Sequence, residues 1–265
     1  MNGPARVGIV PYLNAKPMID GLDRHNEIIR PVYDVPSRLA SMLKAKELDI
    51  AIIPSIEYLR STGLHLLPGI GICSDGIVRS VKLFSRKYPE NISRVALDPS
   101  SCTSNVLLRI ILSEKYGCNP QYLLAPRETS LADLPDIDAI LLIGDQALRE
   151  NRAFTWTLDL GLEWYNLTKL PMVYAVWAGY PHFPNRKKVI PILKECLQNG
   201  LERIDYICRQ EARRLDFSYK MVCEYLTQNI YYKLGENELL GLDRFRSYAR
   251  SYTLIDGETT PRYKP

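Results

Sequence analysis

Short apolar runs alternate with segments of helical spacing along the first two thirds of the chain. The spacing predicts helices at 37–43, 56–61 and 103–116, and a further one near 16–21. Strands that alternate with helices are typical of an α/β fold with a mostly parallel sheet. After residue 185 the apolar residues recur at helical spacing. The predicted strands cover residues 7–10, 28–33, 48–53, 94–97, 137–143 and 171–177, and residues 64–72 and 76–84 are also predicted to be extended.

The strand–turn–helix unit occurs twice, once near the start and once near residue 95, without an exact sequence repeat. Two extended segments, 77–85 and 171–178, would connect the two halves as crossover strands. This pattern predicts a two-lobed fold of the type II periplasmic-binding-protein kind. We expect a discontinuous lobe 1 of residues 1–85 and 179–265, and a lobe 2 of residues 86–178. A ligand would lie in the cleft between the lobes, at the carboxyl ends of the strands.

Charge and composition narrow the choice of ligand. The 34 basic and 30 acidic residues give a net charge of +4, too small and too dispersed for a nucleic-acid-binding protein. No run reaches the roughly 18 apolar residues of a membrane span, and no export signal opens the sequence. We therefore expect a cytoplasmic protein that closes over one small organic acid, with neither nucleic acid nor membrane as a partner.

Motifs for metals and cofactors are missing from the sequence. The six cysteines form no Cys-x-x-Cys pair, and the three histidines are far apart. There is no GxGxxG, Walker or HExxH motif. We expect neither a metal nor a cofactor.

Polar residues follow two predicted strands of the first lobe. Asn14, in the segment that also contains Tyr12, can donate and accept hydrogen bonds but cannot act as a strong base. Ser55 follows the strand 48–53. Each has a simpler alternative role as a helix cap. Glu57, in the first turn of the next predicted helix, suits the helix dipole and needs no other function.

The segment 98–104 is the best anion site in the sequence. Four hydroxyl groups surround the start of a predicted helix, where backbone N–H groups favour a carboxylate. The alternative is a capped helix with a polar surface. Cys102 lies among the hydroxyls but has no nearby histidine, so we do not assign it as a nucleophile. The hydroxyls belong to Ser100, Ser101, Thr103 and Ser104.

Two further segments carry candidate groups. Gly144 follows a buried strand and would let a ligand approach the backbone. Asp145 is a general acid or base, a hydrogen-bond acceptor for the ligand, or an N-cap. In the extended segment 76–82, Ser80 and Lys82 share one face and Arg79 the other. One of these basic residues would meet a carboxylate, unless the segment is only an exposed strand.

Taken in order, several of these segments resemble the chorismate dehydratase family of the futalosine route to menaquinone. The family often has Arg at Cys102 and Gly at Lys169, so the charge of the anion site stays open, with Arg79 or Lys82 as alternative cations. The matching segments are 10–17, 36–40, 48–60, 67–72, 78–81, 98–104, 142–145, 159–161 and 170–177.

The resemblance implies a cofactor-free hydro-lyase that removes water from chorismate to give 3-[(1-carboxyvinyl)oxy]benzoate. Asn14 would orient the leaving hydroxyl or a carboxylate. The base would be the enolpyruvyl carboxylate of the substrate itself or Asp145. The other implied roles are carboxylate binding by Ser101, Thr103 and Ser104, lining of the cleft by Tyr12, Ser55 and Ser80, and closure by Gly144 and Asp145.

Two other functions remain open at this point. One is the related 1,4-dihydroxy-6-naphthoate synthase, although the Ser-Pro-Cys-Pro-Asn type of opening is replaced here by Pro11-Tyr12-Leu13-Asn14. The other is a binding protein for a small carboxylate.

Overall fold

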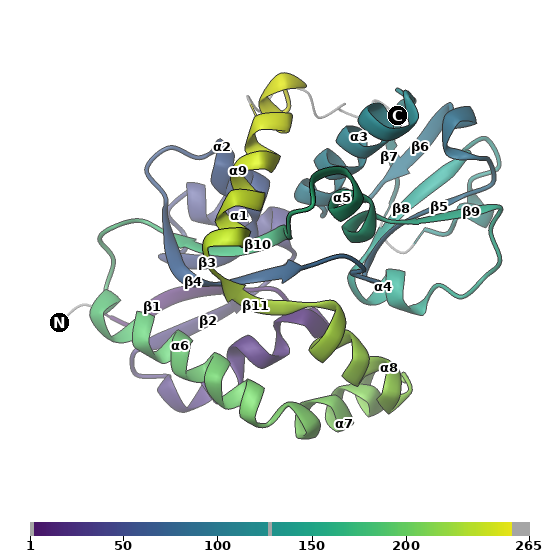
Figure 1. Cartoon of the computed structure of the whole chain (residues 1–265). Helices are drawn as coiled ribbons and strands as arrows, with labels where there is room; N and C mark the ends of the chain where they lie inside the picture. The colour runs from purple at the N-terminus through teal and green to yellow at the C-terminus, as the bar shows by residue number, and fades with distance from the viewer. Residues whose placement is uncertain (1–2, 127–128, 256–265) are drawn as a thin grey trace. The chain divides into compact units, whose positions relative to one another are not determined.

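The computed structural model describes residues 3–126 and 129–255, and it divides the chain into two compact units (Figure 1). Unit 1 comprises Met1–Cys73 and Ala175–Leu234. Unit 2 comprises Ser74–Tyr174 and Gly235–Pro265. Both units are therefore discontinuous in sequence.

The units differ from the predicted lobes at three places, one of which is residues 175–178, predicted in lobe 2 but part of unit 1. Residues 74–85 belong to unit 2, because strand β5 (Val81–Ser85) pairs with two strands of the unit 2 sheet. Residues 235–265 were predicted in lobe 1 but also belong to unit 2. Helix α9 (Glu236–Ser251) packs there against helix α3 (Cys102–Tyr116), and the Phe245 ring meets Trp164 edge-on at 6.0 Å. Amphipathic spacing predicted α9 but not the surface that it covers.

In the described residues, unit 1 is built on a six-stranded sheet of order β11-β4-β10-β3-β1-β2. Strand β1 is parallel to β2 and β3, whereas β10 is antiparallel to β3 and β11 to β4. The sheet is thus mixed, and not mostly parallel as predicted. Its strands are β1 (Ala5–Ile9), β2 (Ile29–Tyr33), β3 (Ile50–Pro54), β4 (His65–Ser74), β10 (Met172–Gly179) and β11 (Tyr231–Leu234).

Helices cover this sheet, with α6 and α7 running beneath the strands in Figure 1. Gly200 of α6 approaches η1 so closely that a Cβ atom would lie 2.0 Å from the carbonyl oxygen of Pro17. The helical elements of unit 1 are η1 (Leu13–Ile19), η2 (Leu22–His25), α1 (Pro36–Lys44), α2 (Ser55–Arg60), α6 (Arg186–Glu202), α7 (Ile204–Leu215), α8 (Tyr219–Glu224) and η5 (Tyr225–Asn229).

The described part of unit 2 contains a five-stranded sheet of order β7-β6-β8-β5-β9. Strand β6 is parallel to β7 and β8, and β5 is antiparallel to β8 and β9. The other strands are β6 (Arg94–Leu97), β7 (Gln121–Leu124), β8 (Ala139–Ile143) and β9 (Trp156–Asp159). The remaining helices are η3 (Pro89–Asn91), α3 (Cys102–Tyr116), η4 (Leu131–Asp133), α4 (Gly144–Arg149) and α5 (Leu160–Thr168).

Local sequence signals account for most of these elements but not for all. The predicted strands at the centre of each sheet are present, whereas β7, β9 and β11 were not predicted. The helix expected near 16–21 is the 3₁₀ helix η1, and the helix expected at 37–43 is α1, which begins at Pro36 with Val35 as its N-cap. Pro36 begins α1 because its fixed φ suits the first helical position. No helix in the described ranges is long and apolar enough to cross a membrane.

Candidate functional site

The strand directions of unit 2 bring its predicted site residues to one edge of the sheet. The carboxyl ends of the parallel strands β6 and β8 lie at this edge, together with the amino end of the antiparallel strand β5. Ser80 therefore lies next to Gly144, whose N–H donates to the Ser80 carbonyl oxygen over 2.7 Å. The segment 101–104 follows β6 at the same edge.

A carboxylate shapes the turn before α3. Asp98 Oδ1 accepts hydrogen bonds from the N–H of Ser100 at 2.7 Å and from its hydroxyl at 2.6 Å. The side-chain amide of Asn105 donates to the Asp98 carbonyl oxygen over 2.8 Å. Asp98 lies in the predicted anion segment 98–104 but was given no role of its own there, and Asn105 was not among the candidates. The Asp-Pro-Ser order was the available signal, because Asp commonly bonds the backbone two residues on.

These bonds divide the four hydroxyls of the segment into two kinds. The Ser100 hydroxyl donates to Asp98, and the Thr103 hydroxyl donates to the Tyr174 carbonyl oxygen over 3.1 Å. A carboxylate only accepts, so the Thr103 side chain cannot also donate to one while this bond is made. The hydroxyls of Ser101 and Ser104 donate to nothing in the described chain, and both residues are about 5% exposed. The predicted anion site therefore narrows to these two.

Gly144 and Asp145 open helix α4. Gly144 has a φ of 58°, in the left-handed region that glycine adopts without strain. Ile143 is the N-cap and Asp145 lies in the first turn, so the capping alternative for Asp145 is wrong. Asp145 is half-buried.

The basic residues of the adjoining segment have different surroundings. Arg79 has a left-handed backbone with a φ of 60°. Lys82 is half-buried in β5, and burial is the main cause that lowers the pKa of its ammonium group. The charge of Asp159 opposes this shift, and that of Arg79 adds to it. The alternative that Lys82 is only an exposed strand residue is therefore wrong.

Unit 1 gathers its own predicted residues at one sheet edge, because β1 and β3 are parallel and both end there. Asn14 is the second residue of η1, whose N-cap is Tyr12, so the capping alternative for Asn14 is wrong. Its Oδ1 atom is buried and accepts no hydrogen bond from the part of the chain that is described. Such orphaned acceptors are rare in folded proteins and call for an explanation.

The other unit 1 candidates surround this edge. Ser55 is fully buried and begins α2, with Pro54 at the N-cap position. Tyr12 is half-buried. Glu57 binds Lys44 and Arg60, at 2.5 and 2.7 Å. Burial raises its pKa, but the two basic partners outweigh burial and lower the pKa overall. Glu57 therefore has a structural role.

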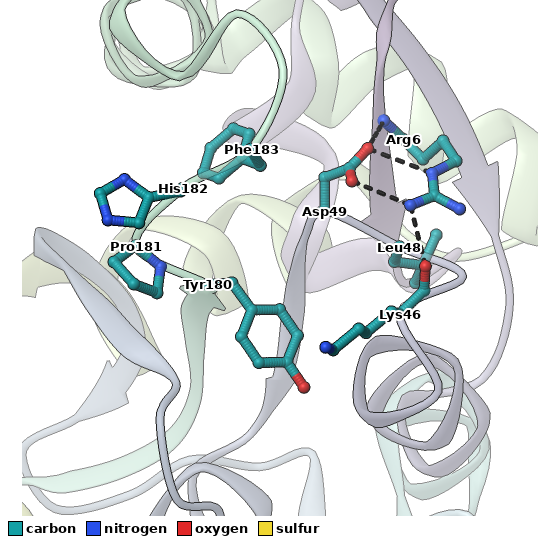
Figure 2. A pocket seen from close by; sticks show the side chains of 8 residues that line it. All are labelled: Arg6, Lys46, Leu48, Asp49, Tyr180, Pro181, His182 and Phe183. Carbon is teal, nitrogen blue, oxygen red and sulfur yellow. Dashed lines mark hydrogen bonds and ion pairs between the residues drawn. The ribbon is translucent and has the colours of Figure 1, made fainter.

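A hollow of about 400 Å³ lies at the opposite edge of the unit 1 sheet (Figure 2). Arg6 at the start of β1 binds Asp49 at the start of β3 through the backbone N–H, Nε and one terminal nitrogen, at 2.7, 3.1 and 2.9 Å. The Lys46 ammonium lies 5.8 Å from the centre of the Tyr180 ring. Ligands of open α/β sheets bind at the carboxyl ends of strands. This hollow lies at the amino ends and contains none of the predicted residues.

Comparison with known proteins decides the family. The model of a family described as menaquinone biosynthesis matches residues 5–251. The chain belongs to this family. The chorismate dehydratase of Thermus thermophilus is 33% identical to this chain over 260 residues, covering 91% of this chain and 94% of the relative. The chorismate dehydratase of Campylobacter jejuni is 28% identical over 246 residues, covering 92% of each.

Solved structures confirm the predicted fold class. A protein of Archaeoglobus fulgidus matches with a TM-score of 0.77 at 16% identity, covering 95% of this chain and 98% of that one. The periplasmic aliphatic sulphonate-binding protein of Escherichia coli matches with a TM-score of 0.64 at 14% identity, covering 96% and 94%. This protein therefore has the α/β fold of the type II periplasmic binding proteins.

Proposed function

We propose that this protein is a chorismate dehydratase, a hydro-lyase that converts chorismate to 3-[(1-carboxyvinyl)oxy]benzoate and water. The observation that carries the proposal is the 33% identity to the Thermus thermophilus chorismate dehydratase, which extends over nine tenths of both chains. The substrate carries two carboxylates and a hydroxyl group. The hydroxyl and amide side chains at the carboxyl ends of the strands in each sheet can form hydrogen bonds with these groups.

The hydroxyls of Ser101 and Ser104 donate to one substrate carboxylate. They are buried at the start of α3, where the helix dipole favours an anion. The Thr103 hydroxyl donates to the Tyr174 carbonyl oxygen. Thr103 therefore contributes to the anion site only through its position in the first turn of α3. Tyr12, Ser55 and Ser80 bind the remainder of the substrate, and Gly144 lets the substrate approach the backbone.

Asn14 orients the leaving hydroxyl. Its orphaned Oδ1 atom is an acceptor, and among the groups of chorismate the hydroxyl is the one that donates. The enolpyruvyl carboxylate takes the ring proton, the C–H electrons form the new ring double bond, and the C–O bond breaks. The departing hydroxide and the abstracted proton together make water. Holding this carboxylate beside the ring hydrogen supplies a base through proximity.

Incubation of the purified protein with chorismate tests the activity. We expect chorismate to disappear as an enolpyruvyl benzoate appears, followed by absorbance and liquid chromatography. Saturable binding without conversion would identify a small-carboxylate binding protein instead. Inertness towards chorismate, with conversion of a later intermediate to 1,4-dihydroxy-6-naphthoate, would identify the sister enzyme.

The variant Asp145→Asn tests the identity of the base. With substrate assistance, this variant keeps turnover within a few-fold, because Asn preserves size and polarity. Loss of turnover with chorismate binding intact would assign the base to Asp145 and refute self-assistance. His182→Ala, in the hollow of Figure 2, is the control and leaves activity unchanged.

The proposal also includes a cytoplasmic location and a reaction without metal or cofactor. In the described residues no three His, Cys, Asp or Glu side chains are grouped as metal ligands. Dialysis against EDTA should leave turnover unchanged, and activity restored by an added divalent ion would contradict this part of the proposal. Fractionation of cells that express a tagged protein tests the location.

A further inference from the structure

One carboxylate outside the proposed set of site residues makes an unusual number of backbone contacts. Asp159 ends β9 and is the N-cap of α5, where its Oδ1 accepts from the N–H groups of Gly161 and Leu162, both at 3.1 Å. The same carboxylate also accepts two N–H groups from another segment. Val78 donates to Oδ1 over 3.0 Å, and Arg79 donates to Oδ2 over 2.7 Å.

The two donors directly precede Ser80. Arg79 has a φ of 60°, a left-handed backbone that residues other than glycine seldom adopt without support. Ser80 is held on both sides, since its N–H donates to the Val78 carbonyl and its carbonyl accepts from Gly144, each over 2.7 Å. Asp159 thus anchors the unusual turn that leads into Ser80.

Close packing supports the same turn. A Cβ atom on Gly161 would lie 2.4 Å from the Gly76 carbonyl oxygen and 2.8 Å from both the Ser74 and the Tyr174 hydroxyl oxygens. The start of α5 can approach the segment 74–80 this closely only because residue 161 is glycine. In the sequence Asp159-Leu160-Gly161, the Asp159 carboxylate therefore accepts hydrogen bonds from the turn, and Gly161 leaves the space that the turn occupies.

We propose that Asp159 is a positioning residue of the dehydration, which sets where the Ser80 hydroxyl meets the substrate by fixing the backbone of Val78 and Arg79. The inference rests on the proposed function, because Ser80 is one of the substrate-binding residues assigned there. Asp159 acts through the turn and does not touch the reacting atoms.

The variant Asp159→Asn removes one contact selectively. Asn is a good N-cap, so its single oxygen can keep the bonds to Val78, Gly161 and Leu162. Its NH₂ group then faces the N–H of Arg79, a donor opposite a donor. The turn should loosen while α5 stays capped. We expect kcat to fall by about 10- to 100-fold with a smaller change in KM, because small displacements at a site cost this much.

The matched control is Asp138→Asn at the opposite edge of the same sheet. Asp138 Oδ2 accepts from the N–H groups of Ser93 and Arg94 at 2.8 and 3.0 Å, and Oδ1 binds Lys87 at 2.7 Å. This variant loses comparable bonds and stability, yet it should keep turnover within about twofold. In a Ser80→Ala background, Asp159→Asn should cause little further loss. Equal losses in both Asn variants, or a full further loss in that background, would overturn the proposal.

Hydrogen exchange separates this inference from the proposed function, because it needs no substrate. Peptides that cover residues 76–80 should exchange faster in Asp159→Asn than in the wild type, while peptides of α3 stay protected. Unchanged exchange at 76–80 would refute the positioning role, even if the wild type dehydrates chorismate. If the wild type does not dehydrate chorismate, the proposed function is refuted. Faster exchange at 76–80 in Asp159→Asn would then still support the anchoring role of Asp159.

Discussion

The N–H of Gly144 donates to the carbonyl oxygen of Ser80 over 2.7 Å, and this bond joins the start of α4 to the amino end of β5. Gly144 makes the bond with a φ of 58°, and Ser80 is 3% exposed. Two segments more than 60 residues apart in sequence are thereby fixed side by side, each with a candidate substrate-binding residue.

Gly144→Ala should weaken both stability and activity. A side chain in the left-handed region costs about 1–2 kcal/mol, and relief of that strain would pull the N–H away from Ser80. We expect a stability loss of about that size by urea unfolding, and a fall of at least tenfold in kcat/KM. Gly117→Ala is the control, since Gly117 caps α3 with a φ of 59° and open space around it. That variant should lose similar stability and keep its activity.

Asn14→Leu should separate function from stability. An orphaned buried acceptor costs free energy, so its replacement by an apolar side chain leaves stability unchanged or raises it by about 1 kcal/mol. Turnover of chorismate should nevertheless fall by about 100-fold, as for other groups that contact a reacting centre. Thermal unfolding and steady-state kinetics measure the two effects. Lower stability with normal kinetics would make Asn14 a structural residue.

Lys169→Gly should stabilise the protein. Lys169 is exposed at the C-terminal end of α5 with a φ of 59°, and its N–H donates to the Tyr165 carbonyl over 2.8 Å. Glycine adopts this conformation without a steric penalty, so it suits this position at the end of α5 better than lysine does. We expect a gain of about 1 kcal/mol in the free energy of unfolding, with kinetics unchanged.

The control for this gain is Lys169→Ala. Alanine keeps the strained backbone and loses the ammonium group that lies 5.3 Å from the centre of the Tyr165 ring. Its stability should therefore be equal to or below that of the wild type. A similar gain in both variants would show that the backbone conformation is not the cause.

Glu57→Gln should lower stability at neutral pH and lose its effect in acid. The pKa of Glu57 is lowered on folding, so the stability it contributes is present above its unfolded pKa of about 4.3 and is lost as the pH falls through the folded pKa. At pH 7 the loss should be about 1–3 kcal/mol, the value of hydrogen bonds to a charged group. Urea unfolding at pH 7 and at about pH 3.5 measures it. The exposed Glu47 provides the control, and Glu47→Gln should change neither value.

The sequence predicted some elements of the fold and not others. The central strands β1, β3, β6 and β8 are buried on both faces, so their apolar runs predicted them. Strands β7, β9 and β11 are four-residue edge strands that each include a polar residue and partly exposed side chains, so no long apolar run marks them. Their existence depends on the neighbouring strand that supplies hydrogen bonds. The membership of α9 likewise depended on the surface available in unit 2.

The candidate site divides in the same way. The sequence alone located the polar strand ends, because the order of strand, turn and helix fixes which residues follow each strand. Only the tertiary structure decided which groups are engaged: Thr103 serves the Tyr174 carbonyl, whereas Asn14 Oδ1 is left without a partner among the described residues. A hydroxyl or amide looks the same in sequence whether or not a distant backbone group meets it. For the same reason, the four N–H donors that converge on Asp159 became visible only in the folded chain.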